Sequence, residues 1–338
     1  MTESSQPKFD NPNLAVDHPE LHHYTTAGGL AGILASKTIW ATHFSDLNDS
    51  SEIRLLQDPL KQALAARCRK LVIERQRENS KMLVRVMKLG GPQKVAEGLA
   101  QDFVASLYQV TFDNDEEKRF GTPFIASFCS HVADQSYERE HGLLSQWRGY
   151  GRDGGYCIVF DTTKLIEFLS LEFSSFDHVH LNVSAARYGD KNADISTLFP
   201  ELVDLLEKFV SEAIRGNTEP SAGEGFAEFL AGATMFKHRG FHEEREARIV
   251  AMPGSKELQA LMLQEDKELK LRPLKTISSP PENGGKRHIS LFQGLNVALP
   301  INRVIVGPSR DQQSNVAKAR DLLGSHIAIS ESETPFIG

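Results

Sequence analysis

Short apolar runs, each five or six residues long and far apart in the chain, constrain the fold most. They are Phe124–Cys129 (FIASFC), Tyr156–Phe160 (YCIVF), Arg248–Met252 (RIVAM) and Arg303–Gly307 (RVIVG). Runs of this length that are rich in β-branched and aromatic residues are typical of buried strands. Stretches with helical spacing separate them, so we expect an α+β fold with helical insertions and not a doubly wound parallel sheet.

The distribution of apolar residues predicts the domain organisation. Residues 1–17 are polar and contain too little apolar surface to pack, so we expect a mobile N-terminal lead. A single α+β domain should then extend over residues 18–330, with a short tail at 331–338. The chain lacks strand-like alternation at about residues 50–107, where we expect an inserted helical region that the Gly90–Pro92 break divides.

Charged residues are unevenly distributed along the chain. Lys and Arg total 38 and Asp and Glu total 45, and the net charge of -7 excludes a uniformly basic nucleic-acid-binding protein. Residues 61–88 nevertheless contain nine basic and two acidic residues, a local net charge of +7. Arg67, Lys70 and Arg77 could contact nucleic-acid phosphates from a helix in this segment. A solvated helical face is the more common explanation.

Neither a membrane span nor a secretion signal is recognisable. No apolar run approaches the roughly 18 to 20 residues that cross a bilayer, and the N-terminus lacks the basic start and apolar stretch of a signal peptide. Cys68, Cys129 and Cys157 are far apart, which argues against a disulfide framework and against a cysteine zinc site. We therefore expect a cytoplasmic protein without membrane contact.

The segment His22–Thr25 (HHYT) has the composition of a short strand. Alternation along a strand places His23 and Thr25 on one face and His22 and Tyr24 on the other. His23 and Thr25 would then present a hydrogen-bonding pair to a ligand. Alternatively, His23 is a core or edge histidine whose hydrogen bonds are satisfied within the protein.

A glycine-rich loop over residues 145–155 carries the pattern G-x-G-x-x-G. Its glycines are Gly149, Gly151 and Gly154. A dinucleotide fingerprint follows a strand and opens a helix, whereas this loop follows a helical piece and leads into a strand, which excludes a Rossmann site. Its aromatic and arginine side chains suit stacking on a ring and pairing with phosphate. The alternative is a turn before a strand, with Trp147 as a packing anchor.

Three charged residues stand at the start of the strand Arg248–Met252. On an extended chain Glu244, Glu246 and Arg248 share one face, with the two carboxylates about 7 Å apart. Such a pair is costly to bury without partners and can change its proton affinity strongly, which is typical of functional carboxylates. An exposed, charged strand start is the alternative.

Two histidines in the same region have a spacing that helical metal ligands use. His238 and His242 are four residues apart, but the string matches neither H-E-x-x-H nor H-x-x-E-H, and Gly240 weakens a helix between them. We therefore expect no metal. A metal-assisted hydrolase or nuclease that uses His238, His242, Glu243 and Glu246 is an alternative function.

Several motifs occur in a fixed order over residues 21–330. They are His23–Thr25, Trp40–Thr42, Leu47–Asp49, Ser127–Ser130, Ser145–Gly151, Lys237–Arg248 and Val304–Pro308. In this order they resemble an uncharacterised bacterial domain family, which is in turn similar to the ADP-ribosyltransferase superfamily. The shared features are a strand histidine followed by a glycine-bearing helix and a second strand, and a glutamate on a late strand.

The resemblance implies an ADP-ribosyltransferase-like split antiparallel sheet that binds NAD, as substrate, in its central cleft. His23 would contact the adenosine ribose, with Thr25 beside it. Glu246, or Glu244 if the strand register differs, would be the catalytic carboxylate that faces His23 across the bound sugar. A carboxylate in this place stabilises the positive charge that develops on the ribose when the nicotinamide bond breaks.

The resemblance assigns the glycine-rich loop to the same ligand. Arg148 would hold the pyrophosphate, and Tyr150 or Trp147 would stack on the nicotinamide. Residues 127–130 and Tyr150 both remain candidates for the middle motif of the superfamily.

The implied activity is transfer of ADP-ribose to a macromolecular acceptor, nucleic acid or protein, in the manner of a bacterial toxin or phage-defence effector. The second alternative, besides the metal-assisted hydrolase, is a non-catalytic module that binds nucleic acid or another partner through residues 61–88.

Overall fold

The computed structural model describes residues 13–112, 121–131, 136–151, 154–215, 222–280 and 284–335. Expectations about residues 1–12, 152–153, 216–221 and 336–338 therefore lie outside the described residues. Contacts divide the chain into two compact units. Unit 1 comprises Met1–Leu47, Arg119–Ala186 and Phe241–Gly338, and unit 2 comprises Asn48–Lys118 and Arg187–Gly240.

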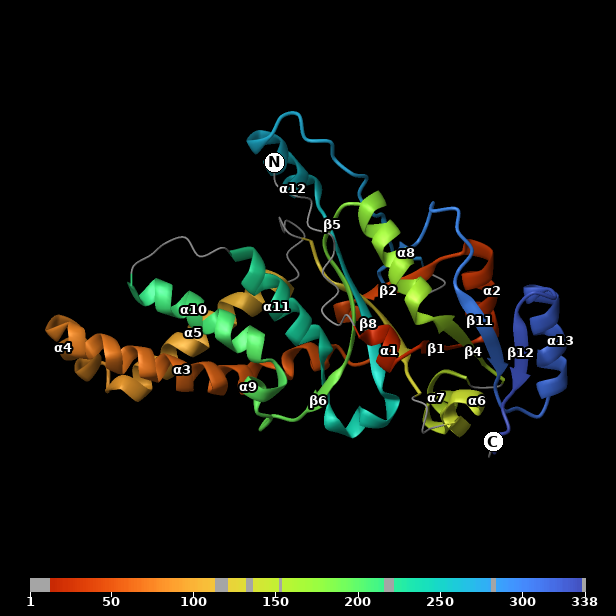
Figure 1. The fold of residues 1–338 in the computed structure, drawn as a ribbon, viewed down its shortest axis with the longest axis horizontal. Coiled ribbons are helices and arrows are strands. Elements are labelled where there is room, and N and C mark those ends of the chain that lie inside the picture. The colour runs from red at the N-terminus through yellow and green to blue at the C-terminus, as the bar shows by residue number, and fades with distance from the viewer. Residues whose placement is uncertain are drawn as a thin grey trace. The chain divides into compact units, whose positions relative to one another are not determined.

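Unit 1 is built on a ten-stranded sheet (Figure 1). Its strands are β1 (Glu20–Thr25), β2 (Ile39–His43), β3 (Phe124–Cys129), β4 (Tyr156–Asp161), β5 (His178–Ala185), β8 (Glu246–Pro253), β9 (Ile277–Ser278), β10 (His288–Leu291), β11 (Ile301–Val306) and β12 (Ala328–Glu331). The order is β12-β11-β4-β1-β3-β2-β10-β9, and β8 pairs with both β3 and β5. Among the described pairs of this sheet, β11 with β12 is parallel and the others are antiparallel.

The sheet forks at β3. One edge of β3 pairs with β8 along its whole length, from Phe124 to Cys129. The other edge pairs with β1 at its end, where Cys129 lies opposite His22, and with β2 at its start, where Ile125 lies opposite Thr42. Two branches therefore leave the same edge of β3, one through β1, β4, β11 and β12 and the other through β2, β10 and β9.

Helix α2 (Ala27–Ser36) connects β1 to β2 and so joins the two branches of the fork. The Thr26 side chain caps its N-terminus by accepting a hydrogen bond from the Gly29 amide at 3.2 Å. The helix ends at Lys37, which has the left-handed conformation that commonly terminates helices.

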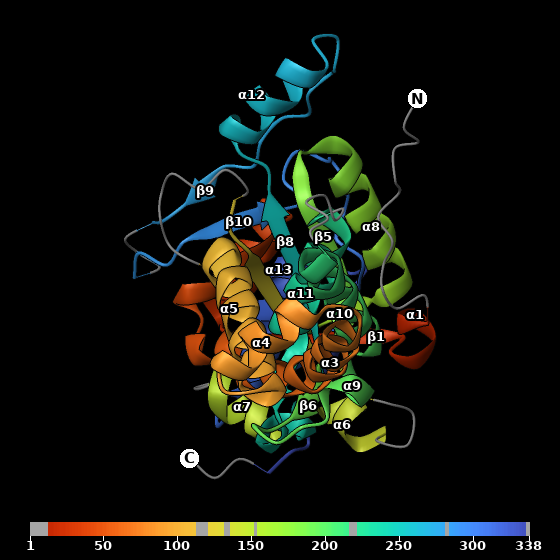
Figure 2. The same cartoon turned by 90° about the vertical axis from the view of Figure 1, so that its left-hand side faces the viewer.

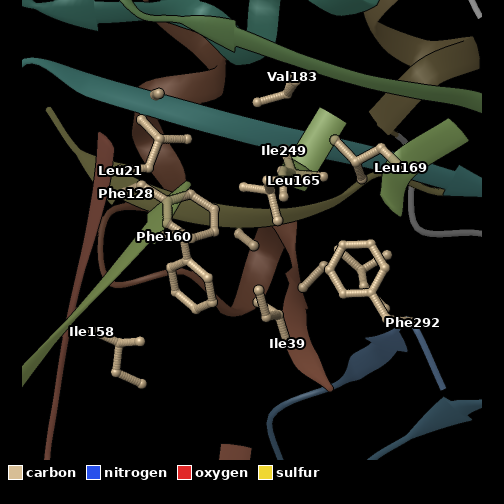
Figure 3. Packing of buried hydrophobic residues seen from close by; sticks show 14 of the residues in the cluster. Leu21, Ile39, Phe128, Ile158, Phe160, Leu165, Leu169, Val183, Ile249 and Phe292 are labelled. Carbon is tan, nitrogen blue, oxygen red and sulfur yellow. The ribbon is translucent and has the colours of Figure 1, made fainter. Parts of the chain in front are cut away.

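The hydrophobic core of unit 1 packs on one face of the sheet. Alternate residues of neighbouring strands, including Leu21, Phe128, Ile158 and Ile249, gather there with apolar residues of α8 (Thr162–Ser175) (Figure 3). Helices α2, α13 (Gln312–Leu323) and α1 (Leu14–Asp17) add residues to the same cluster. The α1 residue Leu14 is fully buried there, so the fold includes the last part of the segment that we expected to be a mobile lead.

Unit 2 is mainly helical, and Figure 2 views several of its helices nearly end-on. Its elements are η2 (Ser50–Arg54), α3 (Gln57–Glu78), α4 (Ser80–Lys88), α5 (Pro92–Phe112), α9 (Ile195–Leu198), α10 (Pro200–Arg215), α11 (Ala222–Met235) and the parallel pair β6 (Arg187–Gly189) and β7 (Phe236–His238). Helix α3 packs against α5 and α10. The rings of Tyr108 and Phe229 meet edge to face, with centroids 5.0 Å apart.

The α+β class is confirmed. The helices expected at about residues 50–107 are present, and they group with residues 187–240 in unit 2. The domain boundaries stay a prediction. None of the helices in the described part of the chain is long and apolar enough to cross a lipid bilayer.

Candidate functional site

The face of the sheet opposite the core of unit 1 carries polar side chains near the fork. Pairing between β3 and β8 sets Cys129 beside Glu246 and Ser127 beside Arg248, whereas Phe128 and Ala247, between them, belong to the core. Because successive side chains of a strand point to opposite faces, Ser127, Glu246 and Arg248 share the other face. By the same reasoning this face, called the polar face below, includes His22 and Tyr24 of β1.

Glu246 and Arg248 form a buried ion pair on the polar face. Nε of Arg248 donates to Oε1 of Glu246 at 2.8 Å, and Nη2 donates to Oε2 at 3.0 Å. The two residues are 4% and 3% exposed. Bidentate pairing of this kind fixes the orientation of the carboxylate.

Ser127 is exposed, whereas the other residues of β3 are buried. Nδ1 of His23 lies 3.2 Å from the backbone carbonyl oxygen of Ser127. A carbonyl only accepts hydrogen bonds, so Nδ1 carries the hydrogen in this contact. His23 therefore ties β1 to β3 at the point where the two strands diverge.

The sheet does not bring His23 and Glu246 together. His23 pairs with Ile158 and has the same alternation as Leu21, so it belongs to the core face, whereas Glu246 belongs to the polar face. Burial lowers the pKa of His23, although its contact with the Ser127 carbonyl acts in the opposite direction. The residue is partly exposed.

Thr25 shares the face of His23, as alternation predicts. It ends β1, and its hydroxyl lies over the first turn of α2. A Cβ added to Gly29 would stand 2.0 Å from Oγ1 of Thr25, so the helix can approach the strand because position 29 is glycine.

Trp147 packs in the interior and is 2% exposed. It lies in α7 (Leu144–Tyr150), where its indole nitrogen donates to the His141 carbonyl at 2.9 Å and its ring meets that of Tyr24 edge to face at 4.8 Å. Gly142, Gly151 and Gly307 also lie against this ring. The structure thus gives Trp147 the role of packing anchor and leaves no ring face for nicotinamide, whereas Arg148 and Tyr150 of the same helix are exposed.

Glu244 is separated from the strand that carries Glu246. It ends the 3-10 helix η3 (Arg239–Glu244), and β8 begins after Arg245, whose φ of +42° breaks the extended conformation. We expected Glu244, Glu246 and Arg248 to share one face of a strand. Glu246 and Arg248 do so, but Glu244 does not.

The two histidines considered as metal ligands lie in different elements, His238 in β7 and His242 in η3. Nδ1 of His238 accepts a hydrogen bond from the Gly240 amide at 3.2 Å. Across the described residues, no group of three or more His, Cys, Asp or Glu side chains is arranged to hold a metal ion.

Of the basic residues considered for nucleic-acid contact, Arg67 is engaged within unit 2. It donates to Glu207 of α10 at 2.8 Å and lies 3.4 Å from Asp204. Lys70 and Arg77 are exposed on α3.

The polar face includes a cluster that sequence reasoning missed. The rings of His22 and His131 are 4.6 Å apart, and Nε2 of His131 lies 3.1 Å from the Tyr24 hydroxyl, which accepts a hydrogen bond from the Leu143 amide. Burial lowers the pKa of His22 to about 3 and that of His131 to about 4. Among the described residues, neither ring nitrogen of His22 has a hydrogen-bond partner of normal geometry.

A carboxylate borders this cluster. Arg139 donates to Glu20 at 2.8 Å, and Arg303 also donates to Glu20. Burial alone would raise the pKa of Glu20, but these hydrogen bonds outweigh it and lower the pKa to about 2. Glu20 is therefore a structural anion in this site.

Trp40 is the exposed aromatic residue on the other branch of the fork. Thr42 lies opposite Ile125, which has the alternation of Ser127, so Trp40 and Thr42 also belong to the polar face. Trp40 is 47% exposed and stacks on His288 with ring centroids 4.0 Å apart. Its alternation with Ile39 and Ala41 is the sequence signal that could have identified it.

Residues 146–249 match a family described as "Protein of unknown function (DUF2971)". The match includes most of α7, β4, Glu246 and Arg248 and supports the expected uncharacterised domain family over this stretch. No curated protein and no solved structure matches the chain.

Proposed function

We propose that unit 1 binds NAD and transfers ADP-ribose from it to a macromolecular acceptor. The observation that carries the proposal is the fork in an antiparallel sheet, because the resemblance of the sequence implies a split sheet of this kind. Strands β8, β3 and β1 are neighbours in that order, so the strands of Glu246, Ser127 and His23 lie side by side at the fork. The glycine-bearing helix α2 between β1 and β2 also fits the resemblance.

In this proposal the ligand lies on the polar face and Glu246 is its catalytic carboxylate. The bond between ribose C1′ and nicotinamide breaks with its electron pair going to nicotinamide, and an acceptor oxygen or nitrogen bonds to C1′ and releases its proton. A preorganised carboxylate stabilises the positive charge that develops on the sugar. Arg248 holds that carboxylate in place.

The remaining site residues take modified roles. His23 acts as a positioning residue, since its hydrogen bond holds the Ser127 backbone at the fork. Thr25 lies beside it on β1. Tyr150 replaces the buried Trp147 as the aromatic residue for nicotinamide, and Arg148 pairs with the pyrophosphate, because both are exposed on α7.

The first test measures release of nicotinamide from NAD by wild type and by Glu246→Gln, with NAD binding followed by calorimetry. We expect Glu246→Gln to lower turnover at least about a hundredfold, the scale of losing one transition-state electrostatic contact, while NAD still binds. Removing one partner of a buried ion pair costs about 3–5 kcal/mol. Glu246→Asp, which keeps the charge but shortens the side chain, therefore serves as the second variant, and exposed Glu243→Gln as the control.

His23 is tested by substitution with Ala and with Gln. We expect His23→Ala to weaken turnover and His23→Gln, whose amide can donate to the Ser127 carbonyl, to restore most of it. Wild-type protein that binds no NAD and releases no nicotinamide would overturn the proposed function. Turnover that a chelator abolishes would instead favour the metal-assisted alternative.

A further inference from the structure

Helix α4 lies at the end of the α3 and α5 helices of unit 2 (Figure 1). It exposes several large apolar side chains. Four large apolar side chains within seven consecutive residues are more than a third exposed: Leu83, Val84, Met87 and Leu89 at 45, 55, 62 and 53%. Contiguous apolar surface of this kind is uncommon on soluble proteins and marks interaction sites.

The helix is a well-formed element, so the exposure does not arise from fraying. The Asn79 side chain caps its start by accepting from the amides of Lys81 and Met82 at 3.0 and 3.3 Å. At its end, the Gly91 amide donates to the Val86 carbonyl at 2.9 Å, and Gly90 and Gly91 have positive φ. Val86 is buried and holds the helix against unit 2.

The charge of this segment is positive. Between residues 79 and 91 there are three basic residues, Lys81, Arg85 and Lys88, and no acidic residue, in a chain of net charge -7. These three are exposed and recur at i, i+4 and i+7, so they form one side of the helix. Leu83 and Met87 recur at i and i+4 on a different side, which makes α4 a cationic amphipathic helix.

We infer that α4 docks unit 2 onto the surface of an anionic lipid bilayer. Aliphatic side chains enter the boundary between head groups and acyl chains, and flanking Lys and Arg attract anionic head groups. Phosphates of nucleic acid would account for the cations but would leave the aliphatic side chains without a partner, and residues 79–91 contain no aromatic ring to stack on a base. A second copy would bring like charges together. The expectation of no membrane contact rested on the lack of a spanning run, and docking on the surface requires none.

The experiment is cosedimentation of the full chain with vesicles. One preparation contains phosphatidylcholine alone and the other contains about one-third phosphatidylserine. We expect binding to the anionic vesicles only, and weaker binding at high salt. Leu83→Asp with Met87→Asp should abolish it, whereas Val110→Asp, 51% exposed elsewhere in unit 2, should not change it.

Charge variants separate the contribution of the basic side chains from that of the aliphatic side chains. Lys81→Glu and Arg85→Glu should each weaken binding at least about fivefold, the effect of one cation near a charged membrane, and Lys256→Glu on α12 (Lys256–Glu265) should have no effect. Circular dichroism confirms that the variants are folded. The inference is overturned if the wild type ignores anionic vesicles, or if Leu83→Asp with Met87→Asp still binds them. The inference is also overturned if the protein binds no vesicles and these variants lose a dimer or lose binding to nucleic acid. The partner of α4 would then be a second copy or a nucleic acid.

Discussion

His22 and His23 are adjacent in the chain, yet they occupy opposite faces of β1. His23 is partly exposed and its imidazole bonds to the Ser127 carbonyl, whereas His22 is fully buried and neither of its nitrogens has a partner of normal geometry among the described residues. A buried polar group without a partner destabilises the folded state. Burial disfavours the charged form of His22, which lowers its pKa.

The pH dependence of stability tests this view of His22. The pKa of His22 is about 3 in the folded protein and 6.5 ordinarily, so the unfolded chain binds more protons between these values. The stability linked to neutral His22 is thus complete above pH 6.5 and is lost as the pH falls toward 3. A one-unit difference in pKa corresponds to about 1.4 kcal/mol.

We expect His22→Leu to be at least as stable as wild type at pH 7 and to lose less stability between pH 6.5 and 4, as measured by urea unfolding. His131 and, below pH 4.5, Glu20 keep part of the acid sensitivity, because their pKa values are also lowered. The control is His326→Leu, on the surface. Equal pH profiles for wild type and His22→Leu would contradict the assignment.

At the scale of elements, glycines allow α7, β1 and β11 to approach one another. A Cβ at Gly155 would stand 2.3 Å from Cα of Gly151 and 2.8 Å from the Thr25 carbonyl oxygen, and one at Gly307 would stand 2.8 Å from the Gly155 carbonyl oxygen. These neighbours are backbone atoms and cannot rotate away. Gly151, the middle glycine of the G-x-G-x-x-G pattern, thus lies in a packing junction.

Two alanine substitutions test this junction. We expect Gly155→Ala to destabilise the protein by about 1–3 kcal/mol or more, since overpacking forces the backbone to shift. Gly149→Ala, where nothing lies within 4 Å of the added Cβ, should have little effect. Thermal unfolding measures both, and similar midpoints for the two variants would show that the junction tolerates a methyl group.

Local pattern predicted the elements better than their relations. Phe124–Cys129 and Tyr156–Phe160 are strands made mainly of buried apolar residues, a pattern visible in the sequence. The alternation of His23 with His22 was visible as well. Whether Glu246 shares a face with His22 or with His23 depends on the register between β1, β3 and β8. This pairing joins residues more than a hundred positions apart.

The burial of Trp147 and the backbone conformation of Arg245 depend on tertiary contacts. Trp147 is buried because Gly142, Gly151 and Gly307 pack against its ring. The sequence does not show that these glycines meet the ring. Arg245 has a positive φ that ends the extended conformation before Glu246, and no residue type at that position signalled it.

At the scale of the molecule, each unit is built from segments that are distant in sequence. In unit 2, Arg67 of α3 pairs with Glu207 of α10, and Tyr108 of α5 packs on Phe229 of α11. The helices of residues 48–112 therefore pack on one another and also bury apolar side chains against residues 187–240.

Expression of fragments tests this dependence. We expect residues 48–118 alone to lack a cooperative thermal transition by circular dichroism, because their apolar residues would stay exposed. Joining them to residues 187–240 through a flexible linker should restore the transition. A cooperative transition in the first fragment by itself would show that the insertion is self-sufficient.

The fork has a consequence for self-association. An unbranched open sheet ends in two edge strands, but the described part of this sheet ends in three, β5, β9 and β12. Each unpaired edge is a template for intermolecular strand addition and fibril growth. Strands β9 and β12 span two and four residues, and short edges are poor templates, so β5, with eight, is where this protein most needs protection against aggregation.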